Sequence, residues 1–169
     1  MKNLSLKQLP LKQLVRAAVI AAVYAALTLA FSGISYGTVQ FRVSEVLTVL
    51  PFFLPEAVWG LTIGCFFANI FSPELGILDL IFGTLATLLA ALVTRRIKHY
   101  YLVPIPTILF NAVIVGLMIT FTSGVPATLF LFLTSAGFVA LGETVVCYIG
   151  GIPFLFAWQK LSKRFSFLR

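Results

Sequence analysis

The apolar positions of this chain form long continuous runs that recur from residue 14 to residue 158, and short polar breaks separate them. Three of the breaks contain turn-forming proline or glycine: PFFLPE at 51–56, SPELG at 72–76 and TSGVPA at 122–127. The runs are continuous and do not alternate with polar residues, which favours membrane helices over the strands of a β-barrel. The pattern therefore predicts an all-α membrane protein that crosses the lipid bilayer several times.

Basic residues gather in three clusters beside these runs, and the positive-inside rule places all three in the cytoplasm. The number of crossings between neighbouring clusters must then be even. At about 20 residues per crossing, four crossings fit between the first two clusters and two between the last two. The clusters are Lys2, Lys7, Lys12 and Arg16; RRIKH at 95–99; and Lys160, Lys163, Arg164 and Arg169.

We therefore expect one integral membrane domain over residues 1–169, with six transmembrane helices and both termini cytoplasmic. The second and third helices are short. The last run is longer than one crossing needs, and the glycines at 150–151 with Pro153 would allow a kink. The expected spans are 13–32, 42–54, 56–72, 75–94, 103–122 and 127–159.

Composition supports a membrane protein without catalytic chemistry of its own. Hydrophobic residues make up 60% of the 169 residues and charged residues 10%, with a mean hydropathy of +1.07, whereas a soluble domain carries about 25% charge. The net charge of +7 sits at the ends of spans, so it fits membrane orientation and does not indicate nucleic-acid binding.

Motifs for nucleotide hydrolysis, metal binding or acyl transfer do not occur in the sequence. There is no G-x4-G-K-[ST], GxSxG, HExxH or CxxC. Cys65 and Cys147 lie inside apolar runs, where they are expected to act as small buried side chains. We expect neither enzyme activity nor a cofactor or metal in this chain.

Three acidic residues and two asparagines fall inside the expected spans, where ionisable and amide groups are costly and are candidates for function. The six-span topology places all five between the outer surface and the membrane midplane, on five different helices. That arrangement predicts a binding pocket open to the outside. The five are Glu45, Asn69, Asp79, Asn111 and Glu143; the other two acidic residues, Glu56 and Glu74, fall in turns and are expected to be solvated.

The stretch SYGTVQFRVSE at 35–45 lies at the outer face in this topology. It carries both charge signs and aromatic rings, more polarity than a membrane loop needs to meet water. We interpret Tyr36, Gln40, Arg42 and Glu45 as a lid and upper wall of the pocket.

Other roles are open for most of these residues. Asp79 would be stabilised at the start of its own helix by the helix dipole, and Asn111 would serve as a helix–helix hydrogen bond. Arg42 and Glu45, three apart, would pair with each other at the water surface. Glu143 is the hardest to explain structurally, because it is expected mid-membrane with no basic residue at its depth.

Alanines one helical turn apart mark the first span as a surface that another helix can approach closely. This face either packs within the bundle or docks a partner protein. It consists of Ala17, Ala18, Ala21, Ala22, Ala25 and Ala26.

Several sequence blocks resemble, in order, those of the QueT family, which comprises substrate-binding (S) subunits of energy-coupling factor (ECF) transporters associated with import of queuosine precursors. The resemblance is close over about residues 40–150 and looser in the first span. The blocks are VQFRVSEVLTVLPFF at 39–53, GCFFANIFS at 64–72, LDLIFGTLATLLAAL at 78–92, NAVIVGL at 111–117 and GETVVCYIGGIP at 142–153.

The resemblance implies a six-helix S component in a prokaryotic plasma membrane that binds a vitamin-like solute from outside and topples to release it inside. Its partners would be a transmembrane coupling (T) subunit, docked through the alanines of the first helix, and two ATPase subunits that hydrolyse ATP. The implied ligand is a 7-deazaguanine such as preQ0 or preQ1, or queuine. Two other readings stay open, namely a proton-coupled secondary transporter with Glu143 as the proton relay and a membrane scaffold without transport.

A deazaguanine offers adjacent N–H donors and one carbonyl acceptor. A carboxylate accepts both donors, and an amide or guanidinium serves the carbonyl. We expect Glu143 to supply the carboxylate and Asn111 or Gln40 to face the carbonyl. An aminomethyl precursor would add a cation, which Glu45 or Asp79 would receive.

Overall fold

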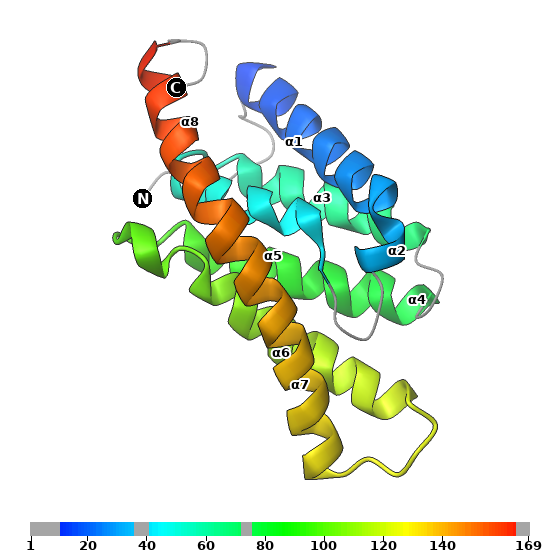
Figure 1. Cartoon of the computed structure of the whole chain (residues 1–169). Helices are drawn as coiled ribbons and strands as arrows, with labels where there is room; N and C mark the ends of the chain where they lie inside the picture. The colour runs from blue at the N-terminus through cyan, green and yellow to red at the C-terminus, as the bar shows by residue number, and fades with distance from the viewer. Residues whose placement is uncertain (1–10, 36–40, 72–75, 165–169) are drawn as a thin grey trace.

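The computed structural model describes residues 11–35, 41–71 and 76–164, and the elements in these ranges are helical (Figure 1). Grouped by continuity, they form six helical segments. The first is α1 (Leu11–Ala30), followed by the single turn α2 (Ser32–Ser35); the second is η2 (Val43–Phe52); the third is α3 (Ala57–Ile70); the fourth joins α4 (Gly76–Leu78), η3 (Asp79–Gly83) and α5 (Thr84–Thr94); the fifth is η4 (Tyr100–Leu102) with α6 (Ile105–Thr122); the sixth joins α7 (Leu129–Thr144), η5 (Val145–Gly151) and α8 (Ile152–Arg164).

These bounds lie within three residues of the expected spans, except that the last helix continues to Arg164 instead of ending at 159. Four segments are long and apolar enough to cross a membrane: Leu11–Ala30, Gly76–Thr94, Tyr100–Thr122 and Leu129–Arg164. As expected, the second and third segments are shorter, with 10 residues in η2 and 14 in α3. The direction in which each segment crosses the membrane stays a prediction.

Four of the six described segments contain a 3₁₀ or π stretch, η2, η3, η4 and η5, and the longest of these are η2 and η5. The ten residues of η2 are a 3₁₀-helix, which rises about 2.0 Å per residue and so covers roughly 20 Å where an α-helix would cover roughly 15 Å. The long last helix contains the π-helical segment η5 just before Pro153. Proline has no N–H to continue the α-helical hydrogen bonds. Where the sequence allowed a kink, at Gly150, Gly151 and Pro153, the structure has the π-helical segment η5.

Helices α1 and α3 pack at unusually close range because glycine faces alanine. A Cβ atom on Gly60 would lie 2.7 Å from the carbonyl oxygen of Ala17, and one on Gly64 would lie 2.7 Å from that of Ala21. No side chain larger than hydrogen fits at either position. Small residues that let two backbones approach are a common basis of helix association in membranes.

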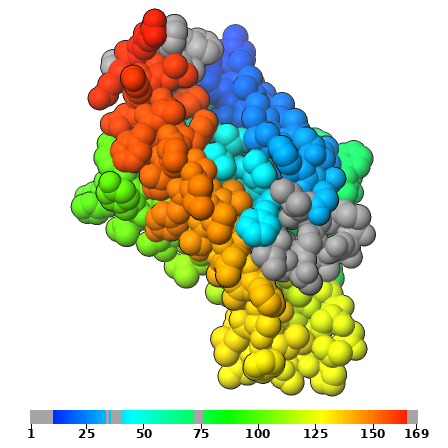
Figure 2. All heavy atoms as spheres, viewed as in Figure 1, coloured from blue at the N-terminus to red at the C-terminus, as the bar shows by residue number. Residues whose placement is uncertain are grey.

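The 3₁₀-helix η2 lies inside the bundle, between α1 and the long last helix. In the space-filling view its atoms (cyan) are visible between α1 (blue) and the last helix (orange) (Figure 2). Leu47, Leu50 and Leu54 belong to the main hydrophobic core with Tyr24 of α1. On the other side, a Cβ atom on Gly150 would lie only 2.6 Å from Val46 Cγ2. The residues just before and within η2 are therefore surrounded by other helices.

The described parts of the three basic clusters lie toward one end of the bundle. Arg16 and Trp158 line the same apolar groove between α1, η2 and α8, and Gln159 Nε2 donates to the Tyr100 hydroxyl at 3.1 Å, which places the loop after RRIKH beside α8. This arrangement is consistent with the prediction that the three basic clusters lie on the same side of the membrane.

One expectation about this end is wrong. Glu56 is not a solvated turn residue, because its side chain is only 2% exposed and its Oε1 lies 3.1 Å from Arg16 Nη1. A buried carboxylate has lost its hydration and needs an opposite charge as partner, which Arg16 of α1 supplies. Glu74, the other predicted turn residue, lies outside the described residues.

Candidate functional site

Six of the predicted site residues are buried at the junction of five helical segments, and we call them the polar cluster. Arg42 precedes η2, Glu45 lies in η2, Asn69 in α3, Asp79 in η3, Asn111 in α6 and Glu143 in α7; each is at most 2% exposed. Tyr36 and Gln40, the two remaining candidates, lie outside the described residues.

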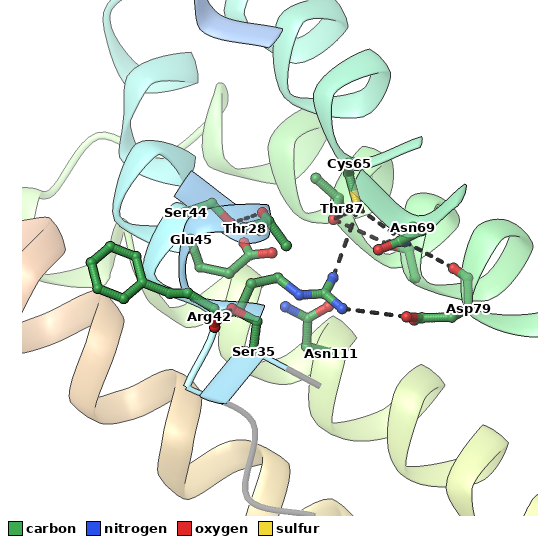
Figure 3. Close-up of polar contacts among 12 residues, drawn as sticks. Thr28, Ser35, Arg42, Ser44, Glu45, Cys65, Asn69, Asp79, Thr87 and Asn111 are labelled. Atoms are coloured by element: carbon green, nitrogen blue, oxygen red, sulfur yellow. Dashed lines mark hydrogen bonds and ion pairs between the residues drawn. The ribbon is translucent and has the colours of Figure 1, made fainter. Parts of the chain in front are cut away.

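Arg42 extends from the start of η2 into the cluster, where its guanidinium faces Asp79 and Cys65 (Figure 3). Its Nη2 lies 3.7 Å from Asp79 Oδ2 in an ion pair with both partners at most 2% exposed. The alternative in which Arg42 and Glu45 pair with each other at the water surface is wrong, because both side chains are buried. Asp79 is the fourth residue of its helical segment, which begins at Gly76, so stabilisation by the helix dipole stays open beside the ion pair.

Three donors converge on the sulfur of Cys65, which the sequence suggested only as a small buried side chain. They are Arg42 Nη1 at 3.8 Å, Asn69 Nδ2 at 3.4 Å and Thr87 Oγ1 at 3.3 Å. Asn69 also donates to the backbone oxygen of Asp79 at 2.9 Å. These contacts link α3 to η3 and to α5.

Asn111 and Glu143 form the second part of the cluster. Asn111 Nδ2 donates to Glu143 Oε1 at 3.1 Å, and the thiol of Cys147 lies 3.6 Å from Glu143 Oε2. The helix–helix hydrogen bond considered for Asn111 is thus present, but it uses only the amide nitrogen. The start of η2 contributes a basic side chain, Arg42, to the same buried cluster as Glu143.

Tyr24 of α1 is a site neighbour that the sequence reasoning missed. Its hydroxyl donates to Glu45 Oε1 at 2.5 Å, and Thr28 and Ser44 share a hydrogen bond of 2.6 Å one turn further along. The signal was available, because Tyr24 and Thr28 continue the inward stripe of Ala17 and Ala21 at helical spacing. A tyrosine on such a stripe brings its hydroxyl into the bundle, where it needs an acceptor.

Several acceptor atoms of the cluster have no hydrogen-bond partner within the described part of the chain. Buried polar atoms are nearly always paired, and leaving one unpaired costs about 1–3 kcal/mol. A group of them in one place therefore indicates where a donor-rich ligand would bind. The atoms are Glu45 Oε2, Asn69 Oδ1, both carboxylate oxygens of Asp79, and Asn111 Oδ1.

Irregular helix geometry occurs at each of the three carboxyl groups. Glu45 lies in the 3₁₀-helix η2, Asp79 is the first residue of the π-helical η3, and Glu143 precedes the π-helical η5 by two residues. Such segments are frequent at functional sites, because the extra or missing residue turns a side chain away from the helix's regular face. Gly83 closes η3 against the cluster, since a Cβ atom there would lie 2.8 Å from both Asn69 Nδ2 and Asp79 Oδ1.

The structure divides the alanines of α1 into two faces. Ala17 and Ala21 are buried against α3, and Ala25 is partly buried beside the main core. Ala18, Ala22 and Ala26 are exposed and spaced one turn apart. Of the six alanines, only Ala18, Ala22 and Ala26 therefore form a surface that another protein could contact.

Comparisons with known proteins support a transporter. The QueT transporter family model matches residues 14–160. The chain is 34% identical to the queuosine precursor transporter QueT of Lactococcus lactis subsp. cremoris (strain MG1363), over 92% of this chain and 95% of that protein. No solved structure matches the chain. With its long apolar helices the chain is a membrane protein, and the match over most of its length shows that it belongs to the QueT transporter family.

Proposed function

We propose that this chain is the substrate-binding subunit of an ECF-type importer that takes up a queuosine precursor from outside the cell. The observation that carries the proposal is the set of buried acceptor atoms that have no hydrogen-bond partner among the described residues, on Glu45, Asn69, Asp79 and Asn111 of the polar cluster. A ligand that fills this site must bring several hydrogen-bond donors. The 34% identical relative is named as a queuosine precursor transporter, and such precursors carry a donor-rich ring.

A 7-deazaguanine fits this set by its chemistry. Its ring N–H and exocyclic amine are adjacent donors that one carboxylate accepts together. The unpartnered Oδ1 atoms of Asn69 and Asn111 accept further donors, and the Arg42 guanidinium faces the ring carbonyl. In a site without water, an analogue that lacks one donor leaves a buried acceptor unpaired. This cost would let the site discriminate a deazaguanine from such an analogue.

The proposed partners are a transmembrane coupling (T) subunit and two ATPase subunits in the plasma membrane of a prokaryote. The exposed alanines of α1, Ala18, Ala22 and Ala26, are the proposed contact for the coupling subunit, because small residues let another helix approach. ATP hydrolysis would then take place on the partner subunits, and this chain would need no cofactor of its own.

Binding of radiolabelled precursor to the purified full-length chain tests the proposal. We expect 7-cyano-7-deazaguanine, 7-aminomethyl-7-deazaguanine or queuine to bind with a dissociation constant below ~1 µM, a free energy of about −8 kcal/mol. The matched pair is 7-deazaguanine and 7-deazahypoxanthine, which differ only in the exocyclic amine, and the second should bind at least about tenfold more weakly than the first. If all three precursors fail to bind below that level, the substrate is wrong.

The coupling is tested separately in reconstituted vesicles. We expect uptake only when the coupling subunit, both ATPase subunits and ATP are present. Uptake driven by a proton gradient in vesicles that contain this chain alone would contradict the proposal and indicate a secondary transporter.

A further inference from the structure

The three carboxyl groups of the polar cluster differ in how their oxygens are occupied. Glu143 has a partner at each oxygen, Asn111 at Oε1 and the Cys147 thiol at Oε2. Asp79 faces the guanidinium of Arg42 at 3.7 Å. Each oxygen of Glu143 thus already accepts one hydrogen bond and keeps a lone pair for a ring donor, and the charge of Asp79 is balanced by Arg42.

Glu45 is held in place but is left with one unpartnered oxygen. Tyr24 donates to Oε1, whereas Oε2 is buried without a hydrogen-bond partner among the described residues. The backbone around Glu45 is also fixed, since its N–H donates to the Arg42 carbonyl at 2.8 Å and its own carbonyl accepts from Thr48 Oγ1 at 2.6 Å. The direction in which Oε2 points is therefore set before any ligand arrives.

Tyr24 is in turn immobilised by the close packing of α1 on α3. Its side chain is fully buried in the main core, and a Cβ atom added to Gly64 would lie 2.9 Å from Tyr24 Cβ. A hydroxyl carried by a side chain this confined orients the carboxylate to which it donates, which makes Tyr24 a positioning residue for Glu45.

The charges of the cluster are unequal. Its six members include three carboxyl groups and one basic side chain, Arg42. A buried carboxylate is stable only when a charge or several donors compensate it. Because Arg42 pairs with Asp79, a positively charged group on the ligand would compensate the excess, and a charge-assisted hydrogen bond is stronger than a neutral one.

We propose that Glu45 receives a positively charged amine of the ligand through Oε2, so that this site prefers a cationic deazaguanine to a neutral one with the same ring. The inference rests on the proposed function, because it takes the deazaguanine as the ligand. It assigns to Glu45 the recognition of ligand charge and to Tyr24 the orientation of Glu45.

The experiment compares two probes that share the ring and differ in charge, 7-aminomethyl-7-deazaguanine and 7-cyano-7-deazaguanine, by calorimetric titration of the purified full-length chain. We expect the amine to bind at least about tenfold more tightly than the nitrile. In Glu45→Gln, which removes the charge and keeps the shape, this ratio should fall to within about threefold, mainly by weaker binding of the amine.

Two further variants separate charge recognition from a general loss of stability. Tyr24→Phe should weaken amine binding at least about threefold and leave nitrile binding nearly unchanged, because only the orientation of Glu45 is lost. Glu56→Gln, which makes the same change at the buried carboxylate beside Arg16, outside the polar cluster, should keep the wild-type ratio.

The outcomes are distinguishable. Equal binding of both probes to the wild-type chain would overturn the charge preference and leave the proposed function standing. A full ratio retained in Glu45→Gln would overturn the role of Glu45. Failure of both probes, and of queuine, to bind the wild-type chain would overturn the proposed function and this inference together.

Discussion

Asn111 of α6 donates a hydrogen bond to Glu143 of α7 at 3.1 Å, with both side chains at most 2% exposed. The bond joins two helices that pack closely, since a Cβ atom on Gly116 would lie 2.9 Å from Cα of Ala136. It also fixes which atom of the amide stays available, because Oδ1 is left without a partner within the described residues. A structural contact and a candidate ligand contact therefore share one side chain.

Replacing Glu143 by Gln tests the carboxylate that we expect to pair with the ring. The amide of Asn111 can still donate to the Gln carbonyl, so the unfolding temperature should change little. A neutral amide accepts only one of two adjacent ring donors, and we expect affinity for a deazaguanine to fall at least about tenfold, or about 1.4 kcal/mol. Titration of the purified variant measures this, and unchanged affinity would remove Glu143 from the binding site.

Replacing Gly64 by Ala tests the close packing of α1 on α3. The new Cβ atom would lie 2.7 Å from the Ala21 carbonyl oxygen, so the helices must separate, at a cost of about 1–3 kcal/mol. The control is Gly137→Ala in α7, where nothing lies within 4 Å of the new Cβ and stability should not decrease. Unfolding of both variants in the same detergent would reveal the difference; equal stability would contradict the packing argument.

Replacing Glu56 by Ala tests the buried ion pair with Arg16. Removal of one partner leaves a mostly buried guanidinium without its carboxylate, and we expect a loss of about 1–3 kcal/mol of stability. In a double-mutant cycle with Arg16→Met, the second change should cost much less in the Glu56→Ala background than in the wild type. Additive losses would show that the two side chains do not interact.

Placing Leu at Ala22 tests the proposed docking face. Ala22 is exposed, so Ala22→Leu should leave folding and precursor binding intact while lowering ATP-dependent uptake at least about fivefold, because a larger side chain keeps a partner helix at a distance. Ala21→Leu is the matched comparison one residue away: Ala21 is buried against Gly64, so this variant should lose stability. Normal uptake by Ala22→Leu would argue against docking on this face.

Much of the helical framework follows from the sequence, because hydropathy acts locally along the chain. A membrane helix needs a continuous apolar run of a certain length, and prolines and glycines mark where the runs break. The expected bounds of η2 and α3, including their shortness, thus agree with the structure to within two residues. The membership of the polar cluster was also predictable, since polar groups inside apolar runs are few.

Only the tertiary structure decides which of these groups are partners. The ion pairs of Arg16 with Glu56 and Arg42 with Asp79 join residues about forty positions apart, and Tyr24 reaches Glu45 from another helix. Hydropathy gives the depth of a residue but not the direction in which its helix faces, which depends on how glycines and alanines let the helices pack. For the same reason the alanines of α1 read as one surface in the sequence, and only their packing against α3 separates Ala17 and Ala21 from the exposed Ala18, Ala22 and Ala26.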